Sequence, residues 1–222
     1  MIRKLAVALA LASTMGVAQA DVLLMENFDD VDALASRGWV LDNRSTQPSI
    51  APGWVQGNPL VLEARDGAPD SYIASDFNVA ADGGQLDNRL FTPLFSLEQG
   101  ARASFWLRGA DDPGFSDMVV YGYTEGSTDP LDFILQMDLT VPTGEWTRYT
   151  VSIGPQAGMG RLGFVHTGAQ LAANYVGLDS LRIDTLPTGV PEPASMLVMG
   201  IGMAGLALAR RRHRAPAFSP RG

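Results

Sequence analysis

The fold class follows from the stretch Thr147-Arg148-Tyr149-Thr150-Val151-Ser152-Ile153. Successive side chains of a β-strand point to opposite faces, so every second residue shares a face. One face would therefore carry Thr147, Tyr149, Val151 and Ile153, and the other the polar Arg148, Thr150 and Ser152. This alternation predicts a strand with one side against an apolar core and the other side in water.

Similar short runs, separated by turn-forming residues, occupy most of the chain between residues 21 and 186. The expected strands are Val22–Phe28, Ser71–Ala74, Leu90–Phe95, Ala103–Arg108, Met118–Thr124, Phe133–Leu139, Trp146–Ile153, Leu162–Thr167 and Tyr175–Asp184. One helical turn is expected at Val31–Arg37. Short strands with regular turn signals between them predict an all-β fold, an antiparallel β-sandwich.

Composition excludes several functional classes. The 222 residues contain 24 acidic and 16 basic side chains and no cysteine, and the net charge is −8. The absence of cysteine excludes a disulfide scaffold, a thiolate zinc site and a cysteine nucleophile. Residues 21–190 keep nine arginines and 23 acidic residues, a net charge of −14. Because nucleic-acid phosphates require a basic surface, we expect no binding to nucleic acid.

Residues 1–20 have the three parts of a secretory signal peptide. Arg3 and Lys4 are followed by the apolar run from Leu5 to Ala12 and by the small-x-small sequence Ala18-Gln19-Ala20. This order predicts export through the Sec translocon and cleavage by signal peptidase after Ala20. The mature chain would begin at Asp21.

A second change of composition follows the expected sandwich of residues 21–186. Residues 187–193 form a linker with Pro191-Glu192-Pro193, and residues 194–214 are an uncharged run that ends in a basic cluster with Arg210, Arg211 and Arg212. Residues 215–222 form a short tail. A helix over the uncharged run, with snorkelling arginines, comes close to the ~30 Å hydrocarbon core of a bilayer. We therefore expect one transmembrane helix, with its arginines on the cytoplasmic side.

The order of Pro-Glu-Pro, short hydrophobic helix and arginine cluster over residues 190–214 resembles the PEP-CTERM sorting signal. This resemblance implies a transient anchor in the inner membrane of a Gram-negative bacterium that makes exopolysaccharide. It also implies processing near Pro191–Pro193 by an exosortase. The tail after Arg214 departs from the usual arginine-rich end of the signal.

Several short motifs occur in a fixed order within the expected sandwich, among them Glu26-Asn27-Phe28-Asp29, Gly53-Trp54-Val55-Gln56-Gly57-Asn58, Asn88-Arg89-Leu90-Phe91-Thr92-Pro93 and Gly144-Glu145-Trp146-Thr147-Arg148-Tyr149. Their order resembles the choice-of-anchor J domain, which is related to cleaved-adhesin and MAM-type modules. The resemblance implies a jelly-roll β-sandwich. The chain departs from the family pattern at Arg89, where Trp is usual, and at Ser180, where a second Asp or Asn is common.

Two carboxylates, Glu26 and Asp179, share the parity of apolar residues in the first and last expected strands. A lone carboxylate on an apolar face is unfavourable unless it is paired, protonated or bound to a metal. If the terminal strands lie side by side, the two carboxylates would meet, and an oxygen-rich site favours Ca²⁺. Asp29 is a third candidate ligand of this structural calcium ion. The alternative is that one carboxylate sits at a bulge or pairs with an arginine.

Trp106 and Trp146 lie opposite the apolar parity of their expected strands, which makes them candidates for stacking on sugar rings. The alternative is that a returning loop packs on them. His166 shares the parity of Leu162 and Phe164, which predicts a core or rim histidine with satisfied hydrogen bonds, the alternative being a general base. No nucleophile motif accompanies His166, so the sequence does not predict catalytic residues.

We therefore expect a non-enzymatic β-sandwich with an adhesin-like binding or structural role at the cell surface or in the extracellular matrix. Its partner would be an extracellular polysaccharide or a surface protein. A carbohydrate-binding module that acts on exopolysaccharide is the first alternative. A hydrolase of matrix glycans is the second, because one sequence does not exclude a pair of carboxylates across a cleft.

Overall fold

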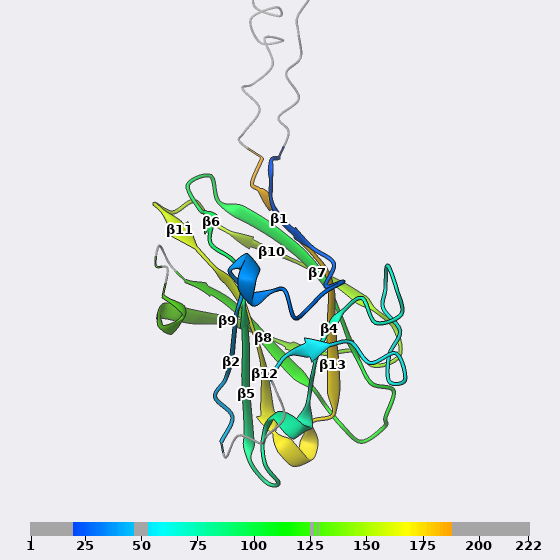
Figure 1. The fold of residues 1–222 in the computed structure, drawn as a ribbon. Helices are drawn as coiled ribbons and strands as arrows, with labels where there is room; N and C mark the ends of the chain where they lie inside the picture. The colour runs from blue at the N-terminus through cyan, green and yellow to red at the C-terminus, as the bar shows by residue number, and fades with distance from the viewer. Residues whose placement is uncertain (1–19, 47–52, 125–126, 128, 188–222) are drawn as a thin grey trace, which may run out of the picture. The chain divides into compact units, whose positions relative to one another are not determined.

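The computed structural model describes residues 20–46, 53–124, 127 and 129–187. Its alternating segments form antiparallel sheets that pack face to face (Figure 1), which confirms the predicted β-sandwich. The limits of the compact unit that contains these sheets are Ala20 and Leu186.

The first sheet has six strands. Its order is β10 (Thr147–Ile153), β7 (Ala101–Gly109), β13 (Tyr175–Thr185), β4 (Ile73–Asp76) and β3 (Val55–Gln56), with β1 (Val22–Glu26) also paired to β13. β13 is long enough to serve two neighbours along the same side. Its first half pairs with β4 and its second half with β1, while β7 lies along its other side.

The second sheet has five strands. Its order is β2 (Val40–Asn43), β5 (Gln85–Phe91), β12 (Leu162–Ala169), β8 (Met118–Thr124) and β9 (Phe133–Thr140). A separate two-stranded ladder joins β6 (Phe95–Ser96) to β11 (Met159–Gly160). Four short 3-10 helices interrupt the connections: η1 (Ala35–Arg37), η2 (Phe77–Val79), η3 (Pro130–Asp132) and η4 (Gln170–Ala172).

The core lies between the inner faces of the two sheets. Phe105 of β7 and Phe164 of β12 are fully buried and meet edge to face, with ring centroids 4.8 Å apart. Tyr149 of β10 stacks on the other side of Phe105 at 5.8 Å. Fully burying a side chain such as Phe stabilises a fold by about 1.5–3 kcal/mol, so this row of rings is a main tie between the sheets.

The first and last strands lie side by side, as expected for a jelly roll. Val22 pairs with Asp184 and Glu26 with Leu181, and β1 begins where β13 ends (Figure 1). This pairing brings the two ends of the described sandwich together in the first sheet.

Candidate functional site

The predicted metal ligands lie where β1 ends against the middle of β13. Two non-glycine residues adopt left-handed backbone conformations here, Phe28 with φ 58° and Ser180 with φ 51°. Non-glycine residues pay a strain energy in this region, and strained residues cluster at functional sites. The junction of β1 and β13 is therefore a candidate functional site.

Ser180 forms a β-bulge that changes which face Asp179 occupies. Three steps along β13, from Asp179 to Arg182, oppose two steps along β7, from Trp106 to Ser104. The extra residue shifts the alternation, so that Asp179 lies on the face of Trp106 while Leu181 returns to the core. The prediction that Asp179 shares a face with Leu181 is therefore wrong, because a one-residue bulge reverses the parity of everything that follows it.

Asp179 is fully buried on this outer face, beneath the segment that joins β3 to β4. Its carboxylate accepts hydrogen bonds from the backbone N–H of Arg65 at 2.8 Å and of Asp66 at 3.4 Å, and from the Ser180 hydroxyl at 3.1 Å. Burial raises the pKa of Asp179, and these donors oppose that rise only in part. The carboxylate thus anchors the connecting segment to the sheet.

The other two predicted ligands have different surroundings. Glu26 forms an ion pair with Arg37 at 3.1 Å and accepts the backbone N–H of Phe28 at 2.9 Å. Asp29 is exposed near Gly67. Among the residues that the structure describes, no three acidic or histidine side chains gather as a metal-binding group. Glu26 is thus paired with an arginine and Asp179 sits at a bulge, the two arrangements that the sequence left as the alternative to calcium.

The two candidate sugar-binding tryptophans lie on the outer face of the first sheet, as their parity predicts, and residues 58–71 cover them. The Arg65 guanidinium lies 4.0 Å from the ring centre of Trp106, in a cation–π contact. The Trp146 indole N–H donates to the Glu63 carbonyl at 3.0 Å. Both tryptophans are partly buried: Arg65 covers one face of the Trp106 ring, and Trp146 has an edge contact with the Tyr72 ring.

A small second core holds this covering segment in place. It consists of Leu62, Tyr72, Ala74 and Tyr175, with Trp146 packed against it. The Tyr72 hydroxyl donates to the carbonyls of the covering segment, at 2.9 Å for Asn58 and 3.0 Å for Leu62. Gly57 lies directly against the Tyr72 ring, where a Cβ atom would clash. The cover is thus a packed part of the domain.

A chain of buried polar groups crosses the core between the sheets. His166 of β12 has Asp117 at 3.1 Å from its Nε2 and the Ser75 hydroxyl of β4 at 2.9 Å from its Nδ1. Asn88 donates to the same hydroxyl at 2.7 Å. These groups are the residue types of a hydrolase triad, but none of them is more than 5% exposed. The prediction of a satisfied core histidine is confirmed.

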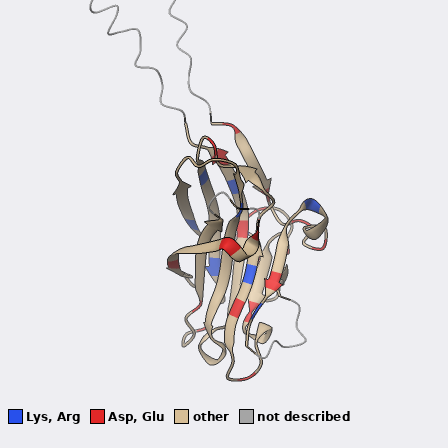
Figure 2. Ribbon diagram, turned by 90° about the vertical axis from the view of Figure 1, so that its left-hand side faces the viewer, with Lys and Arg blue, Asp and Glu red and all other residues tan. Residues whose placement is uncertain are grey.

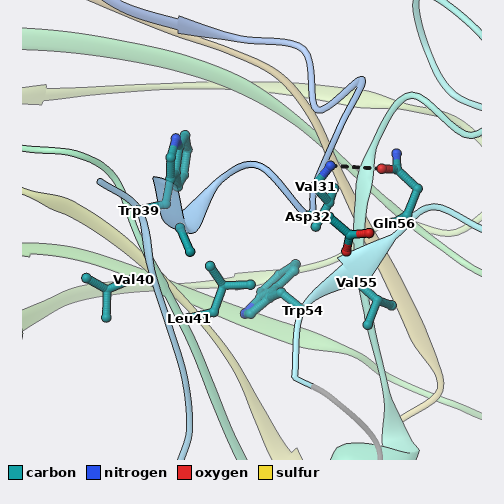
Figure 3. A pocket seen from close by; sticks show the side chains of 9 residues that line it. Val31, Asp32, Trp39, Val40, Leu41, Trp54, Val55 and Gln56 are labelled. Atoms are coloured by element: carbon teal, nitrogen blue, oxygen red, sulfur yellow. Dashed lines mark hydrogen bonds between the residues drawn. The ribbon is translucent and has the colours of Figure 1, made fainter. Parts of the chain in front are cut away.

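A pocket of about 470 Å³ lies at the edge of the sandwich, lined by the segment before η1 and by the edge strands β2 and β3 of the two sheets. Figure 3 shows Trp54 at the middle of its wall, with Leu41 beside it and the Asp32 carboxylate on the other side. Trp39 and Trp54 are only 4% and 2% exposed, so their ring faces are packed. A hydrogen bond of 2.9 Å from the Val31 N–H to Gln56 fixes the rim. The pocket offers apolar walls and one carboxylate.

Sequence reasoning missed Arg65, which both covers Trp106 and donates to Asp179. One signal was present, since Arg65 is the only basic residue among the acidic positions of residues 63–70. Nothing in that pattern shows which strand the segment returns to, because its partners are distant in the chain, with Asp179 lying 114 residues after Arg65.

Several predicted residues lie outside the described part of the chain. They are Ala18 of the signal cleavage site and the sorting residues Pro191, Glu192, Pro193, Arg210, Arg211 and Arg212. Ala20 is the first described residue. Within the described part, no helix has the length and apolar character needed to cross a bilayer. The predicted helix over residues 194–214 lies outside that part.

Comparison with protein families finds the PEP-CTERM protein-sorting motif at residues 189–212, as the sequence predicts. Such a motif implies export and a surface or extracellular destination. Comparison with curated protein sequences gives no match.

Solved structures with similar folds include two domains from Porphyromonas gingivalis W83. The K1 cleaved adhesin domain of Lys-gingipain is 21% identical with a TM-score of 0.59, covering 73% of this chain and 98% of that chain. The K3 cleaved adhesin domain is 19% identical with a TM-score of 0.56, covering 75% and 99%. A xylan-binding domain, CBM22-1 of Paenibacillus barcinonensis Xyn10C, is 13% identical with a TM-score of 0.45, covering 78% and 100%. The chain therefore carries a PEP-CTERM protein-sorting motif behind a β-sandwich with the fold of cleaved adhesin domains.

Proposed function

We propose that the chain is a non-enzymatic exported β-sandwich, displayed at the cell surface or in the extracellular matrix of a Gram-negative bacterium, with an adhesin-like binding or structural role. The observation that carries this proposal is the position of the sorting motif. It begins at residue 189, directly after β13 ends at Thr185. Processing there would release the sandwich with every strand intact.

Export would use the Sec translocon and signal peptidase, and an exosortase would then act at the Pro-Glu-Pro segment. Replacing Glu192 by Ala, and separately Arg210, Arg211 and Arg212 by Gln, should leave a longer precursor in the inner membrane. Cell fractionation and mass spectrometry of the C-terminus would detect it. A normal mature C-terminus in both variants would contradict processing at this motif.

The buried polar chain supports a role without catalysis. Ser75 and Asp117 each form a hydrogen bond with His166 inside the core, and these bonds help to hold the two sheets together. Substrate would have to enter a core whose rings pack at van der Waals contact. A hydrolase assay on the host's exopolysaccharide should therefore show no turnover, and turnover lost on Ser75→Ala would overturn this part of the proposal.

We include calcium only as a structural ion. The side chains at the predicted site suit such an ion only in part. Glu26, Asp29 and Asp179 would supply oxygen ligands beside two strained backbone positions, but Arg37 already neutralises Glu26. Calcium would have to displace this arginine. An ion bound only to the folded state raises its melting midpoint. Equal midpoints of the protein in calcium and in chelator would remove calcium from the proposal.

A further inference from the structure

Exposed apolar side chains are concentrated on η3 and β9. Leu131 is 67% exposed, Ile134 43%, Leu135 58% and Met137 56%. Scattered single apolar residues are normal on a protein surface, whereas a contiguous group indicates a binding surface or an aggregation hazard. We call these four residues the β9 edge group. Pairing with β8 places Ile134 and Met137 on the face of Tyr123 and Tyr121, and Leu135 on the opposite face.

The strand that carries this group is the last strand of its sheet. Among the described residues β9 pairs with β8 alone, so the backbone polar groups along its other side have no strand partner. Only its end is engaged, where the Tyr149 hydroxyl donates to the Thr140 carbonyl at 3.3 Å. Such an edge can accept an additional strand from another polypeptide.

β9 has few of the features that protect an edge. It contains no proline and no lysine, and its one charged residue is Asp138. A bulge near Gln136 shifts the register, since Tyr121 pairs with Met137 and the next residue, Gly122, pairs with Leu135. A bulge disturbs pairing locally, but β9 still runs for eight residues along this edge of the sheet, Gln136 included.

The charge around this edge selects among partners. η3 and β9 contain Asp132 and Asp138 and no Lys, Arg or His, and Asp129 directly precedes η3. η3 and β9 lie on the left in Figure 1, the side that faces the viewer in Figure 2. A second copy of this chain would bring the same acidic surface against itself. A partner with basic side chains would instead be attracted to this edge by the opposite charge.

We propose that β9 is a docking edge for an extended polypeptide segment in which apolar side chains alternate with Lys or Arg. Backbone hydrogen bonds would add the segment as a sixth strand beyond β9. Its apolar side chains would lie beside Ile134 and Met137 on one face of the sheet, and its basic side chains would lie beside Asp138 on the other face and near Asp132 of η3. This inference names a partner for the proposed binding role and rests on it.

The test measures binding of a ten-residue peptide of alternating Val and Lys to the full chain in non-ionic detergent. Calorimetry should give saturable binding that weakens with salt. The double variant Ile134→Ser, Met137→Ser should bind at least tenfold more weakly. The matched variant Leu171→Ser, which changes an exposed leucine on η4, should bind as wild type does.

Two further peptides test the mode of binding on the unaltered protein. A peptide with Glu in place of Lys should not bind, and a peptide N-methylated at alternate residues should lose binding because it cannot complete a strand ladder. Equal binding of all three peptides, no binding at millimolar concentration, or self-association of the chain through β9 at micromolar concentration would each overturn the proposal. Export and processing are measured separately, so failure of the proposed function in cells is distinguishable from failure here.

Discussion

β9 and β10 occupy equivalent places in the two sheets but expose side chains of opposite polarity to the solvent. Each is the last strand of its sheet. β9 buries Leu139 near its end, and β10 buries Val151 and Ile153. The exposed residues of β10 are Arg148, Thr150 and Ser152. Those of β9 include Ile134, Leu135 and Met137.

The difference between the two edges indicates that one is protected against pairing with other chains and the other is not. β10 follows the usual rule that an exposed edge is polar, which prevents pairing with other chains. The domain also covers outward-facing tryptophans elsewhere, by folding residues 58–71 over Trp106 and Trp146. A domain that covers its apolar groups in one place and leaves them exposed in another keeps the second surface for a partner.

The largest expected effect compares two leucines of the same strand. Leu139→Ala should lower the free energy of unfolding by about 2–4 kcal/mol, because it removes a buried side chain and leaves a cavity. Leu135→Ala should change it by no more than about 0.5 kcal/mol, because that side chain is already largely in water. Urea unfolding curves of both variants check this. Equal losses would mean that Leu135 is covered in the protein and that β9 is no open edge.

A smaller effect is expected from the cover on the first sheet. Arg65→Ala removes the cation–π contact with Trp106, which is worth about 0.5–1 kcal/mol at an exposed site. The backbone N–H of residue 65 still reaches Asp179, so the segment should stay in place. Trp106 fluorescence should shift to longer wavelength as its ring becomes hydrated. Arg44→Ala, which removes an exposed arginine paired with Asp42 beside the other sheet, is the matched control, and an identical shift there would contradict the assigned contact.

Sequence patterns predicted the strands well where both faces have a clear environment. The range Met118–Thr124 is the strand β8 as predicted, and β10 begins one residue later than expected. β2 and β3 were missed, because Val40–Asn43 and Val55–Gln56 are too short to show alternation. The strand expected from Leu90 ends at Phe91, since Pro93 cannot continue a ladder.

The site was less predictable for two physical reasons. A bulge such as that at Ser180 inserts one residue, and periodicity alone does not reveal which face follows it. A cover such as residues 58–71 is placed by contacts far apart in sequence, above all that of Arg65 with Asp179. The outward position of Trp106 was predictable from parity, but its burial beneath a guanidinium was not.

The smallest expected effect separates the buried carboxylate of the covered sheet from an exposed one on β9. Because the pKa of Asp179 is raised in the folded state above its ordinary value near 3.8, the folded protein keeps this proton where the unfolded chain has lost it. The stability contributed by Asp179 is therefore greatest below about pH 4 and falls as the pH rises through the raised pKa.

Asp179→Asn should remove that fall, since the amide oxygen still accepts the Arg65 N–H and carries no charge at any pH. Asp138→Asn on β9 removes the same unit of charge from an exposed position and accounts for the change in net charge. Urea unfolding from pH 3 to pH 7 gives the difference between the two variants. If Asp179→Asn instead becomes steadily less stable than wild type as the pH rises above 4, the buried carboxylate is stabilised as an anion. A cation or an arginine must then lie closer to it than the hydrogen bonds of the covering segment indicate.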